Sequence, residues 1–185
     1  RKENRVLLTH QSEPLRHVIE MANKWSKNMV TEQLFRELGR DVSIRPEAIV
    51  GVPKAVGQEK ETTWEKSHVA LFTLLELCQV DRYGLGILNG SGLYTGNVVS
   101  ARQLTSLLRC MRSHQWAEEF RASLAIGGVD GTLRNRFRGE EFRGKVRAKT
   151  GTLNKVSALS GYVQTRVGRE LIFSILMNKT AVPSW

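Results

Sequence analysis

The stretch Val146-Arg147-Ala148-Lys149-Thr150-Gly151-Thr152-Leu153 places a lysine, two hydroxyls and a glycine between apolar residues. This pattern is typical of a β-strand, and two more strand-like segments follow at residues 160–165 and 170–177. We therefore expect an antiparallel meander that begins with residues 146–153 as an edge strand. A fixed positive charge, hydroxyl donors and a glycine on such an edge suit the binding of an anion.

The chain before residue 146 has the apolar spacing of amphipathic helices. Ser12 is expected to cap the first helix with Pro14 in its first turn, and Gly39 is expected to end the second helix. Ser100 is expected to cap a later helix. The remaining expectations are strands at residues 4–10 and 83–88, a long surface loop at 40–61, and helices at about 15–22, 29–38, 63–80, 100–111 and 116–124.

The order of these segments, with helices first and antiparallel strands last, predicts the α+β class, in which helices pack on a sheet. The length of 185 residues suits one domain with a sizeable core. Hydrophobic residues make up 41% and charged residues 25%, as in ordinary soluble globular proteins. The sequence has no apolar run near the ~20 residues that a membrane-spanning helix needs.

The formal net charge of +10 admits three interpretations: a nucleic-acid site, attraction to an anionic polymer or membrane surface, or a solvated basic face. No known nucleic-acid-binding motif accompanies the scattered arginines and lysines, which favours the solvated face. Arg134, Arg136 and Arg138 form one small basic group, which would also suit an anionic polymer. The four histidines lack metal-ligand spacing, so we expect neither a metal nor a cofactor.

Cys78 and Cys110 both fall within apolar helical patterns. Buried free thiols are the interpretation that we prefer for such residues. A disulfide would suit an oxidising compartment, but sequence spacing alone does not decide between the two states. The chain begins Arg-Lys-Glu-Asn, which suggests a mature, cleaved or truncated product.

Three polar motifs occur in a fixed order along the chain. The first is Ser26-Lys27-Asn28 at the opening of a helix, the second is Asn89-Gly90-Ser91-Gly92-Leu93, and the third is Lys149-Thr150-Gly151. Taken singly, each has an ordinary structural explanation. Ser26 would serve as a helix cap, Lys149 would protect a sheet edge from aggregation, and the glycine-rich segment would form a tight turn.

Taken together, these motifs resemble the penicillin-binding D-alanyl-D-alanine carboxypeptidases of the dacB-like branch. The resemblance extends over essentially the whole chain, although Asn89 stands where that branch usually has aspartate. It implies the penicillin-binding serine-transpeptidase (β-lactamase-like) fold. Residues 1–185 would form the C-terminal part of that domain, without the terminal helix that usually covers the sheet.

One family motif has no match here. The family's nucleophile lies in Ser-x-x-Lys, where a lysine one helical turn later removes the proton of the serine. No serine in this chain is followed by lysine three residues later. We therefore expect the nucleophile on an N-terminal part of the same protein, and the alternative is a non-catalytic peptidoglycan-binding relative.

The resemblance also implies roles for individual residues. Ser26 would join the proton network between the nucleophile's lysine and the leaving amine, and Asn28 would orient the substrate amide. Lys149 would supply positive charge near Ser26 and the substrate's terminal carboxylate. The hydroxyls of Thr150 and Thr152 would donate hydrogen bonds to that carboxylate, and the backbone N–H of Thr152 would form half of an oxyanion hole. Gly151 would leave room for the substrate to lie along the strand.

The implied function is serine-type D-Ala-D-Ala carboxypeptidase or endopeptidase action on peptidoglycan, in the periplasm or outside the cell. The implied partners are peptidoglycan peptides ending in D-Ala-D-Ala, β-lactams and the N-terminal part of the same protein, with no nucleic acid and no membrane span. A basic nucleic-acid-binding domain remains the alternative from another class. We further expect the isolated chain to need its missing part or to expose an apolar surface.

Overall fold

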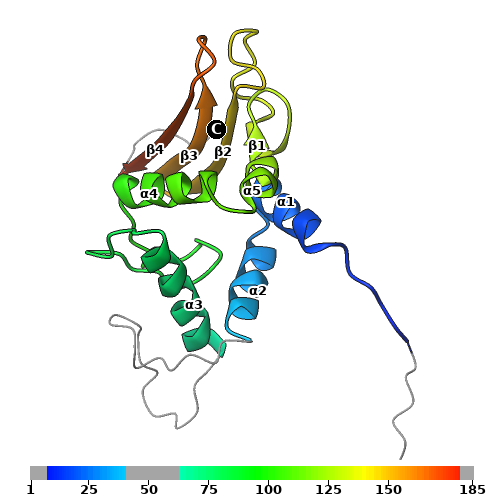
Figure 1. Cartoon of the computed structure of the whole chain (residues 1–185), viewed down its shortest axis with the longest axis vertical. Coiled ribbons are helices and arrows are strands. Elements are labelled where there is room, and N and C mark those ends of the chain that lie inside the picture. The colour runs from blue at the N-terminus through cyan, green and yellow to red at the C-terminus, as the bar shows by residue number, and fades with distance from the viewer. Residues whose placement is uncertain (1–7, 41–62, 180–185) are drawn as a thin grey trace, which may run out of the picture.

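A computed structural model describes residues 8–40 and 63–179 (Figure 1). The strands form one antiparallel sheet in the order β1-β2-β3-β4, and helices pack on it, so the predicted α+β class is confirmed. The elements are α1 (Leu15–Trp25), α2 (Asn28–Leu38), α3 (Thr63–Leu77), α4 (Ala101–Arg112), α5 (Ala117–Ser123), β1 (Ala125–Ile126), the 3-10 turn η2 (Gly131–Leu133), β2 (Val146–Leu153), β3 (Val156–Gln164) and β4 (Glu170–Asn178).

Strand β2 is only partly an edge strand. β1 pairs with its first half, opposite Arg147 and Ala148, and β3 pairs with its whole length. Within the described residues, the outer side of β2 is therefore open from Lys149 onward. Gly161 allows the close approach of β3, because an added Cβ would lie 2.1 Å from the carbonyl oxygen of Arg147. The predicted edge is confirmed for the half of β2 that carries the Lys-Thr-Gly motif.

The two faces of the sheet are covered unequally. Helix α4 lies across one face of the sheet (Figure 1). On that face, Leu108, Leu124 and Tyr162 form a buried cluster. The opposite face has its core near β1 and η2, around Leu133 and Val146. Farther along that face, the β4 side chains are half exposed. Three large apolar residues of β4 are Leu171 (52% exposed), Ile175 (52%) and Met177 (48%).

Those three residues form an exposed apolar strip. Whether the chain needs another segment to fold stays a prediction. No helix in residues 8–40 or 63–179 is long and apolar enough to cross a membrane.

Most helix boundaries agree with the sequence prediction, but the first cap is wrong. Pro14, not Ser12, is the N-cap of α1, and its carbonyl accepts hydrogen bonds from the backbone N–H groups of His17 and Val18. Ser12 lies too far upstream to reach the first free N–H groups of the helix. Ser100 does cap α4, in a reciprocal capping box with Gln103.

The other differences are local. Helix α3 ends at Leu77 rather than near Val80, and Gln79 turns the chain with a φ of 52°. Residues 83–88 do not form the predicted strand, since they make only an isolated bridge between Gly86 and Val98. Of the strand predicted at 4–10, residues 8–10 have no regular structure and the rest lie outside the described residues. The loop predicted at 40–61 also lies outside them, apart from Arg40.

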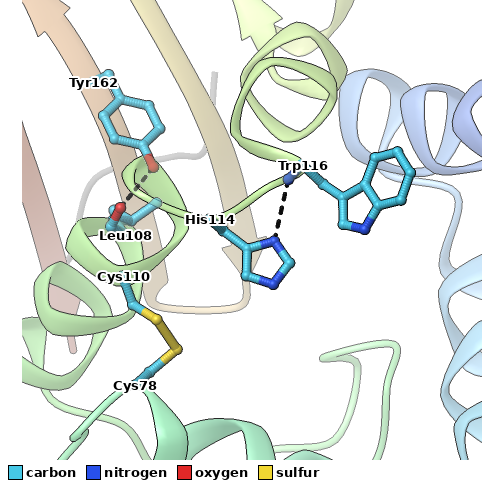
Figure 2. Close-up of a disulfide and its surroundings, with 6 residues drawn as sticks. All are labelled: Cys78, Leu108, Cys110, His114, Trp116 and Tyr162. Carbon is cyan, nitrogen blue, oxygen red and sulfur yellow. Dashed lines mark hydrogen bonds between the residues drawn. A yellow bond between two sulfur atoms is a disulfide. The ribbon is translucent and has the colours of Figure 1, made fainter.

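Cys78 and Cys110 form a disulfide, so the preferred prediction of free thiols is wrong (Figure 2). Phe72 and Leu75 of α3 and Leu107 of α4 belong to one apolar cluster. This packing brings the Cα atoms of the two cysteines to 5.4 Å, a distance that a disulfide spans. The bond therefore ties the segment after α3 to the helix that covers the sheet.

Tyr162 makes a second connection at the same helix. Its hydroxyl donates a hydrogen bond of 2.7 Å to the carbonyl oxygen of Leu108 (Figure 2). Burial and the nearby carboxylate of Glu170 raise the pKa of Tyr162 to about 12. The phenol thus remains a neutral donor that holds β3 against α4.

Candidate active site

Ser26 lies in a sharp turn between two helices. It is the C-cap of α1 in the left-handed region, with φ 53° and ψ 51°, and α2 begins two residues later at Asn28. A non-glycine residue in this region costs on the order of 1–3 kcal/mol. The N-cap position of α2 is held by Lys27, and no side chain caps that helix. Ser26 is therefore not the helix N-cap of the alternative interpretation, and its hydroxyl is available for other bonds.

Lys149 of β2 reaches that hydroxyl from the other end of the chain. Its Nζ donates to Ser26 Oγ at 2.8 Å, across 123 residues of sequence, and to the carbonyl oxygen of Thr150 at 2.7 Å. Burial lowers the pKa of Lys149 from its ordinary value. In the part of the chain that the structure describes, no carboxylate forms an ion pair with it. The result is a partly desolvated cation beside a hydroxyl, which is suited to attract an anion.

The hydroxyl of Thr150 points to η2. Its Oγ1 donates to Oγ1 of Thr132 at 2.8 Å, and both side chains are half-buried. Thr152, two residues along the same face of β2, is exposed. Between them, Gly151 leaves little space toward β3, since an added Cβ would lie 3.3 Å from that of Ala158.

Asn28 is placed near Ser26 by sequence and by the start of α2. Its carbonyl oxygen accepts a hydrogen bond from the hydroxyl of Thr31, and its half-buried side-chain amide has no hydrogen-bond partner among residues 8–40 and 63–179. An amide without an internal partner can donate to one ligand group and accept from another. The structure thus joins Ser26, Lys149 and Thr150 through direct contacts, and adds Asn28 as a neighbour without a direct bond to them.

The turn that precedes β2 fixes the position of α1. Nζ of Lys24 lies 2.6 Å from Asp130 Oδ2 and 2.9 Å from Glu20, and Asp130 Oδ1 accepts the backbone N–H of Ile126 at 2.7 Å. Burial opposes the charge of Lys24, but the hydrogen bonds and charges of Asp130 and Glu20 outweigh it, and its pKa is raised. Gly131 fits against α1 with φ +55°, where a Cβ would lie 2.5 Å from the carbonyl oxygen of Lys24.

Residues 130–132 therefore connect α1, which ends beside Ser26, to β2, which carries Lys149: Asp130 and Gly131 contact Lys24, and Thr132 contacts Thr150. A second tie comes from Asn23, whose side chain donates to the buried hydroxyl of Ser123 at 2.8 Å. The sequence motifs pointed to neither Asp130 nor Thr132 as a site residue. Their signal was a polar pair within a glycine-rich turn just before the strand.

The glycine-rich segment 89–93 is used differently. Glu32 of α2 accepts the backbone N–H groups of Gly90 and Ser91 at 3.2 and 3.1 Å, and Asn89 Oδ1 accepts the N–H of Gly92 at 2.9 Å. Gly90 lies so close to α2 that a Cβ would lie 2.4 Å from the Cβ of Phe35. The prediction that this segment shapes a turn rather than performs chemistry agrees with these contacts.

Residues 8–40 and 63–179 hold no cluster of three or more histidine, cysteine or acidic side chains able to bind a metal ion. The chemistry that the site offers is that of a lysine cation, hydroxyls and an amide. These groups can hold a carboxylate, orient an amide and transmit a proton.

Comparison with known proteins places this arrangement in one family. The model of the D-Ala-D-Ala carboxypeptidase 3 (S13) family matches residues 1–184. The chain is 37% identical over 184 residues to a D-alanyl-D-alanine carboxypeptidase of Actinomadura sp. (strain R39), an alignment that covers 97% of this chain and 31% of the relative. It is 30% identical over 174 residues to the carboxypeptidase DacB of Mycolicibacterium smegmatis, covering 91% and 34%.

Solved structures share the fold. Penicillin-binding protein 4 (dacB) of Haemophilus influenzae, in complex with a β-lactam, matches with a TM-score of 0.76 at 22% identity, over 95% of this chain and 37% of that one. A penicillin G-acylated predatory endopeptidase of Bdellovibrio bacteriovorus matches with a TM-score of 0.57 at 22% identity, over 89% and 39%. The predicted penicillin-binding fold is thereby confirmed.

The chain spans about a third of the length of the relatives that it matches. The family match spans residues 1–184, a range that includes all three polar motifs. The chain therefore belongs to the D-Ala-D-Ala carboxypeptidase 3 (S13) family.

Proposed function

We propose that this chain carries the substrate-recognition part of a serine-type D-Ala-D-Ala carboxypeptidase or endopeptidase that acts on peptidoglycan. The observation that carries the proposal is the 2.8 Å contact between Lys149 Nζ and Ser26 Oγ. Two motifs from distant parts of the chain meet there with a positive charge and a hydroxyl, the groups that acyl transfer to and from serine requires.

The nucleophilic serine and its lysine would lie outside residues 1–185, because no serine here is followed by a lysine three residues later. The serine would attack the carbonyl between the two D-alanines and form an acyl-enzyme, and water would then release the acyl group. Ser26 would carry a proton toward the leaving amine. Its hydroxyl accepts from Lys149 and keeps its own proton to donate, which is what a relay group needs.

Lys149 and the β2 hydroxyls would bind the substrate's terminal carboxylate. The partly desolvated charge of Lys149 supports this role, and Thr152 is exposed beside it. The open outer side of β2 from Lys149 onward would pair with the substrate backbone as an added strand. The side-chain amide of Asn28, which has no hydrogen-bond partner among the described residues, would orient the substrate's amide. The backbone N–H of Thr152 would supply half of an oxyanion hole.

The same groups would bind β-lactams, whose carboxylate and strained amide imitate the D-Ala-D-Ala terminus. The enzyme would act in the periplasm or outside the cell, where its cell-wall substrate lies. The disulfide between Cys78 and Cys110 supports that placement, because disulfides persist in oxidising compartments.

Intact-mass spectrometry of the full-length gene product after incubation with penicillin G tests the proposal. We expect one added penicilloyl group on the wild-type protein, and markedly slower labelling of the Lys149→Ala variant. Lys27→Ala is the matched control, since Lys27 is an exposed neighbour of Ser26. A folded wild-type protein that gains no mass would contradict the acyl-enzyme function. Peptidoglycan binding that depends on Lys149 and Thr150 would then favour a non-catalytic relative.

A further inference from the structure

The hydroxyl of Thr150 has one proton, which it donates in a hydrogen bond to the hydroxyl of Thr132. The Oγ1–Oγ1 distance is 2.8 Å, with Thr150 as donor. In the function proposed above, the same hydroxyl donates to the substrate's terminal carboxylate. One hydroxyl cannot donate to both partners at once, because it carries a single O–H bond.

Thr132 has the chemistry to resolve this conflict. Its own hydroxyl carries a proton and can donate to a lone pair of Thr150 once the Thr150 proton turns outward. The change needs only the rotation of two O–H bonds, and no proton leaves either residue. The outcome is a chain in which Thr132 donates to Thr150 and Thr150 donates to the carboxylate. Hydrogen bonds in such a chain polarise and strengthen one another.

The position of Thr132 is well fixed for this task. It lies in η2, directly after two anchored residues. Asp130 holds Lys24 and the backbone N–H of Ile126, and Gly131 lies against the carbonyl of Lys24, where no larger residue fits. The backbone that presents Thr132 to β2 is therefore tied to the helix that ends at Ser26.

We propose that Thr132 is a positioning residue for carboxylate recognition, which accepts a hydrogen bond from Thr150 before substrate enters and donates one to Thr150 afterwards. The inference rests on the proposed function, because it requires that Thr150 binds a carboxylate. It concerns affinity for one end of the substrate, and it predicts no role for Thr132 in bond cleavage.

The test compares two peptides in the full-length gene product: one ending in D-Ala-D-Ala with a free carboxylate, and the same peptide with a C-terminal amide. Thr132→Val keeps the side-chain shape and removes the hydroxyl, and Thr132→Ser keeps the hydroxyl. We expect Thr132→Val to raise KM for the acid by about 2- to 12-fold, the range for one neutral hydrogen bond, with kcat unchanged. KM for the amide should not change, and Thr132→Ser should resemble the wild type.

A double-mutant cycle with Thr150→Val separates this role from a merely structural one. If Thr132 acts through the Thr150 hydroxyl, Thr132→Val has no further effect on the acid once Thr150 is valine. An equal loss on acid and amide, an undiminished loss in the Thr150→Val background, or failure of Thr132→Ser to restore affinity would each overturn the inference. A folded wild-type protein that hydrolyses neither peptide overturns the proposed function itself, which makes the two failures distinguishable.

Discussion

Two of the three polar motifs, residues 89–93 and the Lys-Thr-Gly motif of β2, are used by the structure in opposite ways. In residues 89–93, the polar atoms bond to the segment's own backbone, and Glu32 of α2 accepts two of its N–H groups. In β2, the side chain of Lys149 reaches Ser26, and that of Thr150 reaches Thr132. The hydrogen bonds of the first segment are made within the segment and to Glu32, and they hold its conformation, whereas the second segment holds a cation and hydroxyls together at an open strand edge.

The difference teaches how to separate scaffold from site when both are rich in glycine and polar residues. A segment whose polar groups are consumed locally stabilises a conformation. A segment with a partly desolvated cation that has no carboxylate partner can bind an anionic ligand favourably, because that charge is not already neutralised by the protein. Changes in the scaffold should therefore reduce stability, and changes in β2 should reduce acylation and leave the fold intact.

The largest expected effect is a loss of stability when the disulfide between Cys78 and Cys110 is removed. Removing the disulfide with Cys78→Ala and Cys110→Ala should lower the free energy of unfolding by about 3–4 kcal/mol, because the bond closes a loop between residues 32 apart in sequence. Urea unfolding of the full-length protein measures this change. The rate of penicillin acylation well below the melting temperature should stay within about twofold of wild type. A large fall in that rate with unchanged stability would contradict the separation.

The next effect concerns the charge in β2. Lys149→Ala should slow penicillin acylation about 10- to 150-fold, since a hydrogen bond from a charged group is worth roughly 1.5–3 kcal/mol. The control is Lys27→Ala, which removes an exposed charge at the N-cap of α2 beside Ser26. Stopped-flow or quenched-mass kinetics gives both rates. Equal losses in the two variants would mean that only the general positive field near Ser26 matters.

Removing Glu32, which holds residues 89–93, should reduce stability. Glu32→Ala takes away the acceptor for Gly90 and Ser91 N–H, and should cost roughly 1–3 kcal/mol of stability. Glu37→Ala, which breaks an exposed ion pair with Arg40, should cost less than about 1 kcal/mol. Thermal melts compare the two. A Glu32→Ala protein with wild-type stability would show that the loop is not held by this carboxylate.

The smallest effect concerns how affinity for a carboxylate-bearing peptide depends on pH. Burial lowers the pKa of Lys149, so Lys149 loses its charge at a lower pH than a free lysine, whose value is 10.5. Affinity for a carboxylate-bearing peptide should therefore fall on a limb centred below 10.5. Because the folded pKa is depressed, the uncharged form is favoured by folding, and the Lys149 contribution to stability rises with pH over that range. In Lys149→Arg, the limb should disappear from this range.

Much of the fold was readable from the sequence because local signals and packing agree there. The cap at Ser100, Gly39 after α2, and the three long strands follow from capping and strand patterns. The first cap was misassigned because Pro14 itself adopts the extended capping conformation. The disulfide could not be foreseen because it depends on how α3 and α4 pack, which sequence spacing does not encode.

The candidate site shows the same limit. The pairing of Ser26 with Lys149 was reached through a family resemblance, and no local pattern links residues 123 positions apart. Thr132 and Asp130 were missed because each acts through a partner on another element, Thr150 and Lys24. Tertiary hydrogen bonds of this kind become visible only once the chain is folded.

The most direct test of the central claim is a double-mutant cycle of Ser26→Ala and Lys149→Met, read as the rate of penicillin acylation of the full-length protein. We predict strong non-additivity, with the double variant little slower than the slower single variant, because the two side chains act through one contact of 2.8 Å. Fully additive losses would mean that Ser26 and Lys149 act independently, and would contradict a single functional unit built from the two motifs.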